Sequence, residues 1–177
     1  MADDLSRIEK LIDQDPTPER VCTELAKLLN VKSDEVALLR AEKEVLKFLF
    51  PPGLKTAGSI PLSSSAVAAR TAVTRTTMLS NAFARVKHAW VFEGVKSPFQ
   101  EGNAASEPTP IQKMMSVPVL QETGPALGVI QVSRKGVDGK SAGPDFTGED
   151  LRKLEQAAAA IAKMALMRDS KEPQKED

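Results

Sequence analysis

The chain has 177 residues, 41% of them hydrophobic and 27% charged, which suits one folded domain rather than a disordered or disulfide-rich chain. Its 24 basic and 24 acidic residues give a formal net charge of zero, which argues against a general nucleic-acid binder. The single cysteine cannot form an intramolecular disulfide. Together with the single histidine it cannot build a four-ligand zinc site without carboxylates or a second chain.

Membrane and export signals are missing from the sequence. No apolar run reaches the ~18 residues that a membrane span requires, and MADDLSRIEK lacks the basic and then apolar profile of a signal peptide. We therefore expect a soluble cytoplasmic protein. Its predicted organisation is an N-terminal helical extension (residues 1–16), one domain (17–168) and a disordered charged tail (169–177).

Helical spacing of apolar residues predicts two helices at the N-terminus. The first carries one stripe, made of Leu5, Ile8, Leu11 and Ile12. Proline disfavours helix at the residue before it, so Asp15-Pro16-Thr17-Pro18 separates the two helices. Thr17 can cap the second helix, which runs to residue 30 on the stripe Val21, Leu25, Leu28 and Leu29.

Alternating side chains then predict two strands, over residues 36–40 and 45–50, with Pro51-Pro52-Gly53 ending the second. Residues 58–62 add a short edge segment. The serines at 63–65 are expected to cap a small Ala-rich helix over 66–73, and a short strand is predicted over 76–79.

The middle of the chain gives weaker signals. Phe83, Val86 and Trp90 recur at helical spacing and predict a helix with one aromatic face. Residues 97–110 hold three prolines and a glycine, which predicts a long mobile loop.

The C-terminal third predicts a hairpin and a helix. A strand over 114–120, with Pro118 at an edge or bulge, turns at 121–125 into a strand over 126–134. After a loop over 136–143, Thr147 and Asp150 have the spacing of a capping box, and Phe146 can contact Leu151. The helix that starts there is predicted to run to about Met167.

Taken together, these elements resemble a GAF domain. The resemblance rests mainly on the hairpin MMSVPVL…ALGVIQVSRKG and the helix start FTGEDLRKLEQAAAAIA, and it covers roughly Pro18 to Met167. In that family a Val-Pro-Val strand precedes a Gly-Val-Ile strand, and Phe-Thr-x-Glu-Asp-Leu opens a long Ala-rich helix. The resemblance implies an α+β fold of the GAF/PAS kind, in which N- and C-terminal helices flank a central antiparallel sheet of five or six strands.

The resemblance also implies a function. Members of the family are usually sensory or regulatory modules that bind small molecules and often dimerise through their terminal helices. Their ligand pocket lies on the sheet face away from those helices, here roofed by residues 81–112. Fold alone does not fix function, so we keep two alternatives to this non-catalytic sensor. One is a protein-interaction module without a ligand, and the other a small redox enzyme of the methionine sulfoxide reductase type.

Candidate ligand contacts follow from this placement. They are Phe83, Val86, His88, Trp90, Arg75, Met78 and Met114. The aromatic ones can equally be plain core. No acid occurs between Glu44 and Glu93, whereas six bases do: Lys47, Lys55, Arg70, Arg75, Arg85 and Lys87. This segment is either a surface whose counter-charges come from elsewhere or a site for an anionic small molecule.

Two single residues raise specific chemistry. His88 can ligate haem or orient a ligand, although a histidine beside a lysine is more often a surface residue. No cofactor is required by the sequence. Cys22 lies beside the apolar stripe of its helix and is expected to be structural rather than a redox thiol or a chromophore attachment point.

Several activities and one contact surface can also be assessed. The sequence lacks a P-loop, HExxH and GxSxG, and it lacks the Asn-Lys…Phe…Asp-Glu pattern of GAF domains that bind cyclic nucleotides. A seam on the last helix is a candidate dimer contact or packs on the domain's own sheet. Its members are Leu151, Leu154, Ala158, Ile161 and Ala165.

Overall fold

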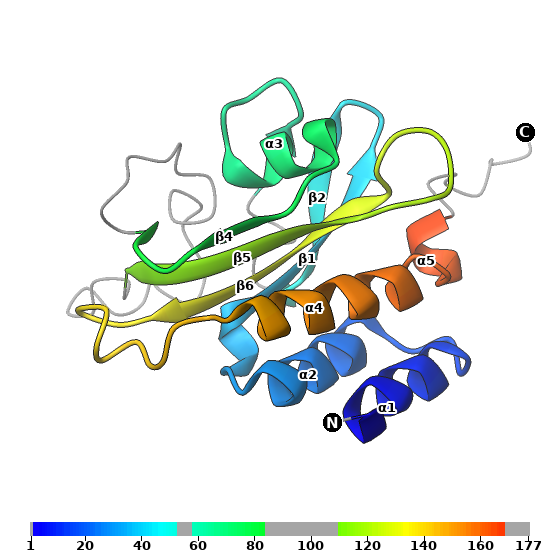
Figure 1. Ribbon diagram of the computed structural model, residues 1–177. Helices are drawn as coiled ribbons and strands as arrows, with labels where there is room; N and C mark the ends of the chain where they lie inside the picture. The colour runs from blue at the N-terminus through cyan, green and yellow to red at the C-terminus, as the bar shows by residue number, and fades with distance from the viewer. Residues whose placement is uncertain (1, 53–57, 84–109, 169–177) are drawn as a thin grey trace, which may run out of the picture.

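The computed structural model describes residues 2–52, 58–83 and 110–168, with side chains from residue 5 onward. Helices in chain order are α1 (Ala2–Ile12), α2 (Pro18–Leu29), the short 3-10 helix η1 (Ser33–Glu35), α3 (Val67–Thr74), α4 (Gly148–Ile161) and α5 (Ala165–Arg168). Strands are β1 (Val36–Glu42), β2 (Val45–Phe50), β3 (Ser59–Pro61), β4 (Met78–Ser80), β5 (Ile111–Val119) and β6 (Gly128–Lys135). Figure 1 shows their arrangement.

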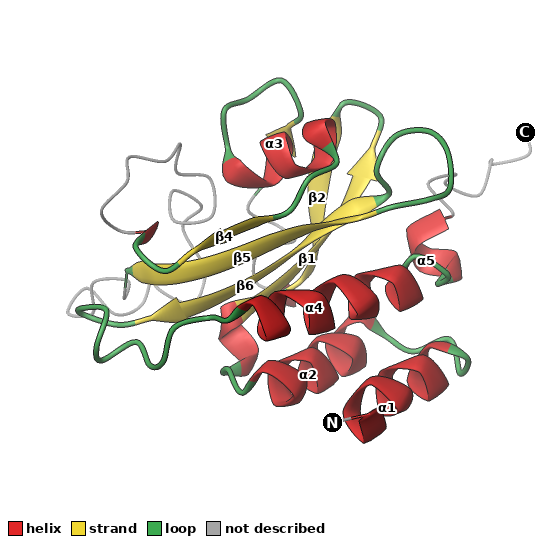
Figure 2. Ribbon diagram, in the orientation of Figure 1, coloured by secondary structure: helices red, strands yellow, loops and turns green. Residues whose placement is uncertain are grey.

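One antiparallel sheet of six strands organises the described residues, in the order β3-β2-β1-β6-β5-β4. The predicted hairpin is its longest pairing, running from Ile111↔Lys135 to Val119↔Gly128. Among the described residues, pairing with β4 covers only Met114 to Ser116, so Pro118 lies beyond the end of that pairing, a position where proline is tolerated. The predicted α+β architecture, an antiparallel sheet flanked by N- and C-terminal helices, is confirmed (Figure 2).

The terminal helices form a layer on one face of the sheet. Both main helices begin as predicted: Thr17 accepts a hydrogen bond from the Arg20 N–H at 3.3 Å, and Thr147 and Asp150 form the capping box of α4. Helix α1 packs on α2 and α4. Its apolar stripe is therefore used inside the chain, where Ile8 is fully buried.

The larger hydrophobic core lies between this helical layer and the sheet. Side chains on one face of β1, β5 and β6 meet those of α1, α2 and α4. The largest of them are fully buried: Ile8, Leu25, Leu38, Met115, Ile130, Leu154 and Ile161. Burying a Leu or Ile side chain of this size stabilises the fold by about 1.5–3 kcal/mol.

Helix α3 covers part of the opposite face, which we call the distal face. Beneath it lies a second core of small and aliphatic residues, including Ala69, Leu39, Leu46 and Val129. The predicted serine cap is wrong. Helix α3 starts at Val67, and its N-cap is Ala66, which has no polar side chain to cap the helix. The Ser64 hydroxyl oxygen accepts the Ala66 N–H at 3.4 Å, one residue before the helix begins.

The predicted continuous helix to Met167 is also wrong. Helix α4 ends at Ile161, and the N–H groups of Lys163 and Met164 bond to the carbonyls of Ala160 and Ile161, a tighter turn than that of an α-helix. Helix α5 then follows. This turn brings Met164 and Met167 into the core, where their exposed fractions are 2% and 1%.

Candidate functional site

The distal face carries buried polar side chains among apolar ones. Thr71, on α3, donates its hydroxyl hydrogen to the Val67 carbonyl at 2.8 Å, so its oxygen accepts from Ser116 Oγ at 2.8 Å. Ser116 in turn accepts from Gln131 Nε2 at 3.3 Å. These contacts form a directional chain from β6 through β5 to α3. All three side chains are 3% exposed or less, and such burial of polar groups requires hydrogen bonds of this kind.

An apolar cluster adjoins this polar chain. Phe83, Ile111 and Met114 are 4% exposed or less, and Met78 packs against them. Met78 pairs with Ser116 across β4 and β5. The structure therefore brings together Phe83, Met78 and Met114 from the predicted ligand contacts, and it adds Ile111. Their role in binding stays a prediction.

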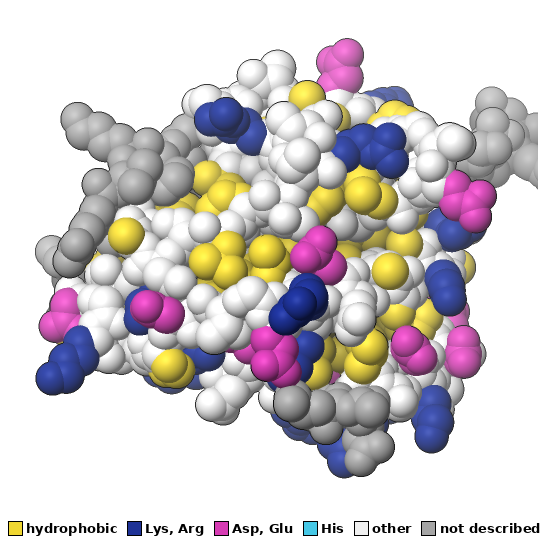
Figure 3. All heavy atoms as spheres, in the orientation of Figure 1, with side chains coloured by type: hydrophobic (Ala, Val, Ile, Leu, Met, Phe, Trp, Pro, Cys, Tyr) yellow, Lys and Arg dark blue, Asp and Glu magenta, His cyan; other side chains and the backbone are white. Residues whose placement is uncertain are grey.

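Arg75 does not join this cluster. It ends α3 with a left-handed backbone (φ 56°), is exposed, and donates a long hydrogen bond to the Gln121 carbonyl at 3.4 Å. It lines a separate open groove of about 440 Å³, together with Glu155, Val117, Pro118 and other residues of α4 and β5. Figure 3 shows hydrophobic side chains gathered between α4 and the edge of the sheet formed by β4 and β5.

The remaining predicted contacts, Val86, His88 and Trp90, lie outside the described residues. The same holds for Lys55, Arg85 and Lys87 of the acid-free segment. Of the described bases there, Lys47 is exposed and pairs with Glu42 at 2.8 Å, and Arg70 and Arg75 are exposed on and just after α3. Within the described ranges these bases do not converge on the distal face, so an anionic site there stays a prediction.

The sequence did not predict a pair of hydrogen bonds at the edge of the site, between Asn81 and Phe146. The Asn81 amide donates to the Phe146 carbonyl at 3.0 Å and accepts from the Phe146 N–H at 2.8 Å. These bonds fasten the end of β4 to the residue that precedes the α4 cap. The polar chain was missed as well. A glutamine and serines within otherwise apolar strands were its only signal.

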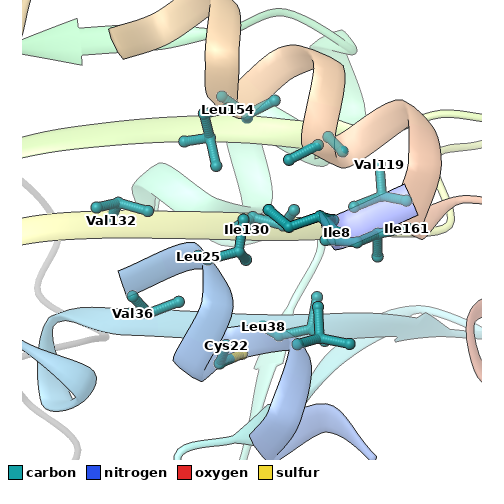
Figure 4. Packing of buried hydrophobic residues seen from close by; sticks show 14 of the residues in the cluster. Ile8, Cys22, Leu25, Val36, Leu38, Val119, Ile130, Val132, Leu154 and Ile161 are labelled. Carbon is teal, nitrogen blue, oxygen red and sulfur yellow. The ribbon is translucent and has the colours of Figure 1, made fainter. Parts of the chain in front are cut away.

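Cys22 is fully buried in the core of the helical layer, and not beside its apolar stripe as the sequence suggested. Figure 4 shows it on α2 among apolar side chains. Burial raises the pKa of the Cys22 thiol, because the thiolate would be poorly solvated there. The thiol thus lies on the opposite side of the sheet from the polar chain.

This burial predicts a pH dependence. The thiol of the unfolded chain ionises at about pH 8.5, whereas the buried thiol keeps its proton at that pH. Alkaline pH therefore removes the proton from the unfolded state alone. Stability is therefore expected to fall above that pH by up to about 1.4 kcal/mol per pH unit from this group. Urea unfolding of the wild type and Cys22→Ala between pH 7 and 10 measures it. An equal slope in both proteins would contradict the assignment.

The described residues hold neither a candidate metal cluster nor a membrane-spanning helix. Within residues 2–52, 58–83 and 110–168, no group of three or more His, Cys, Asp or Glu side chains could hold a metal ion. In the same ranges no helix is long and apolar enough to cross a membrane.

The fold itself is shared with known structures, although no family model and no curated protein matches the sequence. The solved structures that superpose on the chain over most of its length are mostly GAF domains. The fold is therefore that of a GAF domain, as the sequence resemblance implied.

Three of the similar solved structures show how closely the folds agree. A GAF domain from an Acinetobacter phosphoenolpyruvate-protein phosphotransferase matches with a TM-score of 0.65 and 14% identity over 91% of this chain and 89% of that one. A putative GAF sensor protein from Burkholderia vietnamiensis gives 0.62 and 17% over 96% of each chain. The type II free methionine-R-sulfoxide reductase of Thermoplasma acidophilum gives 0.57 and 15% over 89% and 94%.

Proposed function

We propose that the chain is a non-catalytic sensory or regulatory domain that binds a small molecule on its distal face. The observation that carries the proposal is the buried hydrogen-bonded chain of Gln131, Ser116 and Thr71 beside the apolar cluster of Phe83 and Met114. Small-molecule sites combine mostly apolar side chains with a few fixed polar groups, and these buried side chains have that composition. The solved structures described as GAF sensor domains support the same function.

The distal face is connected to the helical layer through the sheet. Strand β6 carries Gln131 and, three residues later, Arg134. Arg134 donates to the Leu29 and Asn30 carbonyls at the end of α2. On β1, Arg40 donates to the Leu166 carbonyl of α5 at 3.2 Å. We propose that a ligand shifts the population of arrangements of the sheet, and that these contacts pass the change to the terminal helices at a dimer or partner interface. The cytoplasmic location expected from the sequence is part of this proposal.

The first test is thermal unfolding across a panel of metabolites weighted towards anions and nucleotides. A ligand at about 100 times its dissociation constant adds about 2.7 kcal/mol of stability, which raises the melting temperature measurably. Gln131→Met should reduce the shift, because it removes the amide while keeping the volume. Arg75→Ala should keep it, because Arg75 lines a different groove.

The absence of any shift across the panel would overturn the sensor and favour the protein-interaction module. An absorption spectrum of the purified protein tests the haem alternative at His88. A shift that Arg75→Ala abolishes and Gln131→Met keeps would move the site to the groove beside α4.

The reductase alternative is favoured by one observation, the structural similarity to the Thermoplasma acidophilum enzyme. Thiol chemistry here would depend on Cys22, the one cysteine of the chain, which is fully buried on the helical side of the sheet. We therefore expect no reduction of free methionine sulfoxide by the wild type. Activity that Cys22→Ser removes would establish the enzyme and overturn the non-catalytic proposal.

A further inference from the structure

The hydrogen-bonded chain on the distal face fixes which way the Gln131 amide is turned. Thr71 gives its hydroxyl hydrogen to the Val67 carbonyl at 2.8 Å, so the hydroxyl of Ser116 donates to Thr71, also at 2.8 Å. Ser116 then has only lone pairs left, and its partner 3.3 Å away must be the N–H side of the amide, Nε2. The amide oxygen of Gln131, Oε1, is therefore turned away from Ser116.

This oxygen has no hydrogen-bond partner among the described residues, although Gln131 is only 3% exposed. Its neighbour on β1 is Ala37, which has no polar side chain, and Ser133 gives its hydroxyl hydrogen to the Glu35 carbonyl at 3.3 Å. In the described ranges, the fully enclosed side-chain polar atoms without a partner are the Nε atoms of two arginines, so Oε1 keeps a small opening. A nearly buried acceptor of this kind is costly to leave unpaired, and a donor from a ligand would satisfy it.

The surroundings of the amide indicate the rest of the ligand. Nε2 carries two hydrogens and gives one to Ser116, so the amide offers an acceptor and one N–H, which is the complement of another amide. Met114, on the neighbouring strand β5, lies one residue pair further along the sheet and clusters with Phe83 and Met78. Thioethers and aromatic rings pack favourably against an aromatic ring. None of these side chains is charged, so a charged ligand would lose its hydration here without gaining a counter-charge from them.

We propose that the distal face takes an uncharged aromatic compound with an amide-like group, whose N–H donates to Oε1 of Gln131. This inference rests on the proposed function, because it names the class of small molecule bound at the same site. The ring of the ligand packs against Phe83 and Met114. The hydrogen bonds through Ser116 and Thr71 hold the acceptor in place, so a ligand that presents only acceptors leaves Oε1 unpaired and binds more weakly.

Three probes of nearly equal shape test the donor and the charge together. Benzamide carries an N–H donor, acetophenone replaces its NH2 by a methyl group, and benzoate replaces it by a charged oxygen. Titrations of the full chain, followed by NMR, measure the three dissociation constants. Benzamide should bind at least about tenfold more tightly than either analogue. Nicotinamide, 3-acetylpyridine and nicotinate repeat the comparison on a second ring.

Thr71→Val tests whether the chain of hydrogen bonds sets this preference. Valine keeps the shape but removes the hydroxyl, so Ser116 is free to donate to the amide oxygen and the amide can turn over. The preference for benzamide over acetophenone should then fall below about threefold, and Ser116→Ala should have the same effect. Thr74→Val is the matched control, because Thr74 makes the same kind of bond, to the Arg70 carbonyl at 2.7 Å, on the exposed side of α3. It should keep the tenfold preference.

Two results would overturn the proposed ligand class. One is a wild type that binds acetophenone or benzoate as tightly as benzamide, or that binds none of the probes on either ring. The other is a full preference retained by Thr71→Val and Ser116→Ala while circular dichroism shows them folded. In either case, a melting shift with another metabolite that Gln131→Met reduces would still support the small-molecule site. A panel without any shift, together with probes that do not bind, would overturn both proposals.

Discussion

Replacing Gly128 by alanine is expected to cost about 3 kcal/mol or more of stability, or to prevent folding. An alanine Cβ there would lie 2.1 Å from the Leu39 carbonyl oxygen and 2.6 Å from the end of the Met167 side chain. The methionine can move, but the carbonyl belongs to the backbone of β1, which pairs with β6 along its length. The added methyl group therefore forces two central strands apart. Urea unfolding of Gly128→Ala measures the loss.

Gly139→Ala is the matched control. No atom lies within 4 Å of the Cβ that this change would add, so its stability should stay within about 0.5 kcal/mol of the wild type. A Gly128→Ala protein as stable as this control would show that β1 and β6 do not approach as closely as described. The Gly-Val-Ile run is part of the resemblance to GAF domains, and this close approach gives its glycine a physical reason.

Replacing Arg134 by alanine is expected to cost about 3 kcal/mol. Arg134 is 7% exposed and donates to the Asn30 and Leu29 carbonyls at 3.0 and 3.2 Å, where α2 ends with acceptors that lack helical partners. Its guanidinium also stacks 4.8 Å from the centre of the Phe146 ring. Hydrogen bonds from charged groups contribute about 1.5–3 kcal/mol each, and burial of the charge offsets part of that gain. Chemical denaturation gives the difference.

Arg134→Lys should fall between alanine and the wild type, because an ammonium keeps the charge but lacks the planar fork that bonds two carbonyls and stacks on a ring. Arg152→Ala, an exposed change on α4, should stay within about 0.5 kcal/mol. An Arg134→Ala protein as stable as Arg152→Ala would show that the carbonyls of α2 are satisfied without this side chain.

The sequence by itself determined the elements and the fold class of the described residues. Starts of α2 and α4 depend on Thr17 and on Thr147 with Asp150, whose partners lie three residues away. Strands β5 and β6 follow from alternation and a short turn. Such signals are local, because a cap or a turn is completed within a few residues, and a period of two or 3.6 can be read from a short window.

Only the tertiary structure decided how those elements meet. The hydrogen bond between Thr71 and Ser116 joins residues 45 positions apart, and Arg40 reaches Leu166 across 126 positions. Burial of Cys22 and the break after Ile161 likewise depend on which faces pack against the sheet. A side chain's hydrogen-bond partner and exposure are set by neighbours that the fold brings close. No pattern within one segment encodes them.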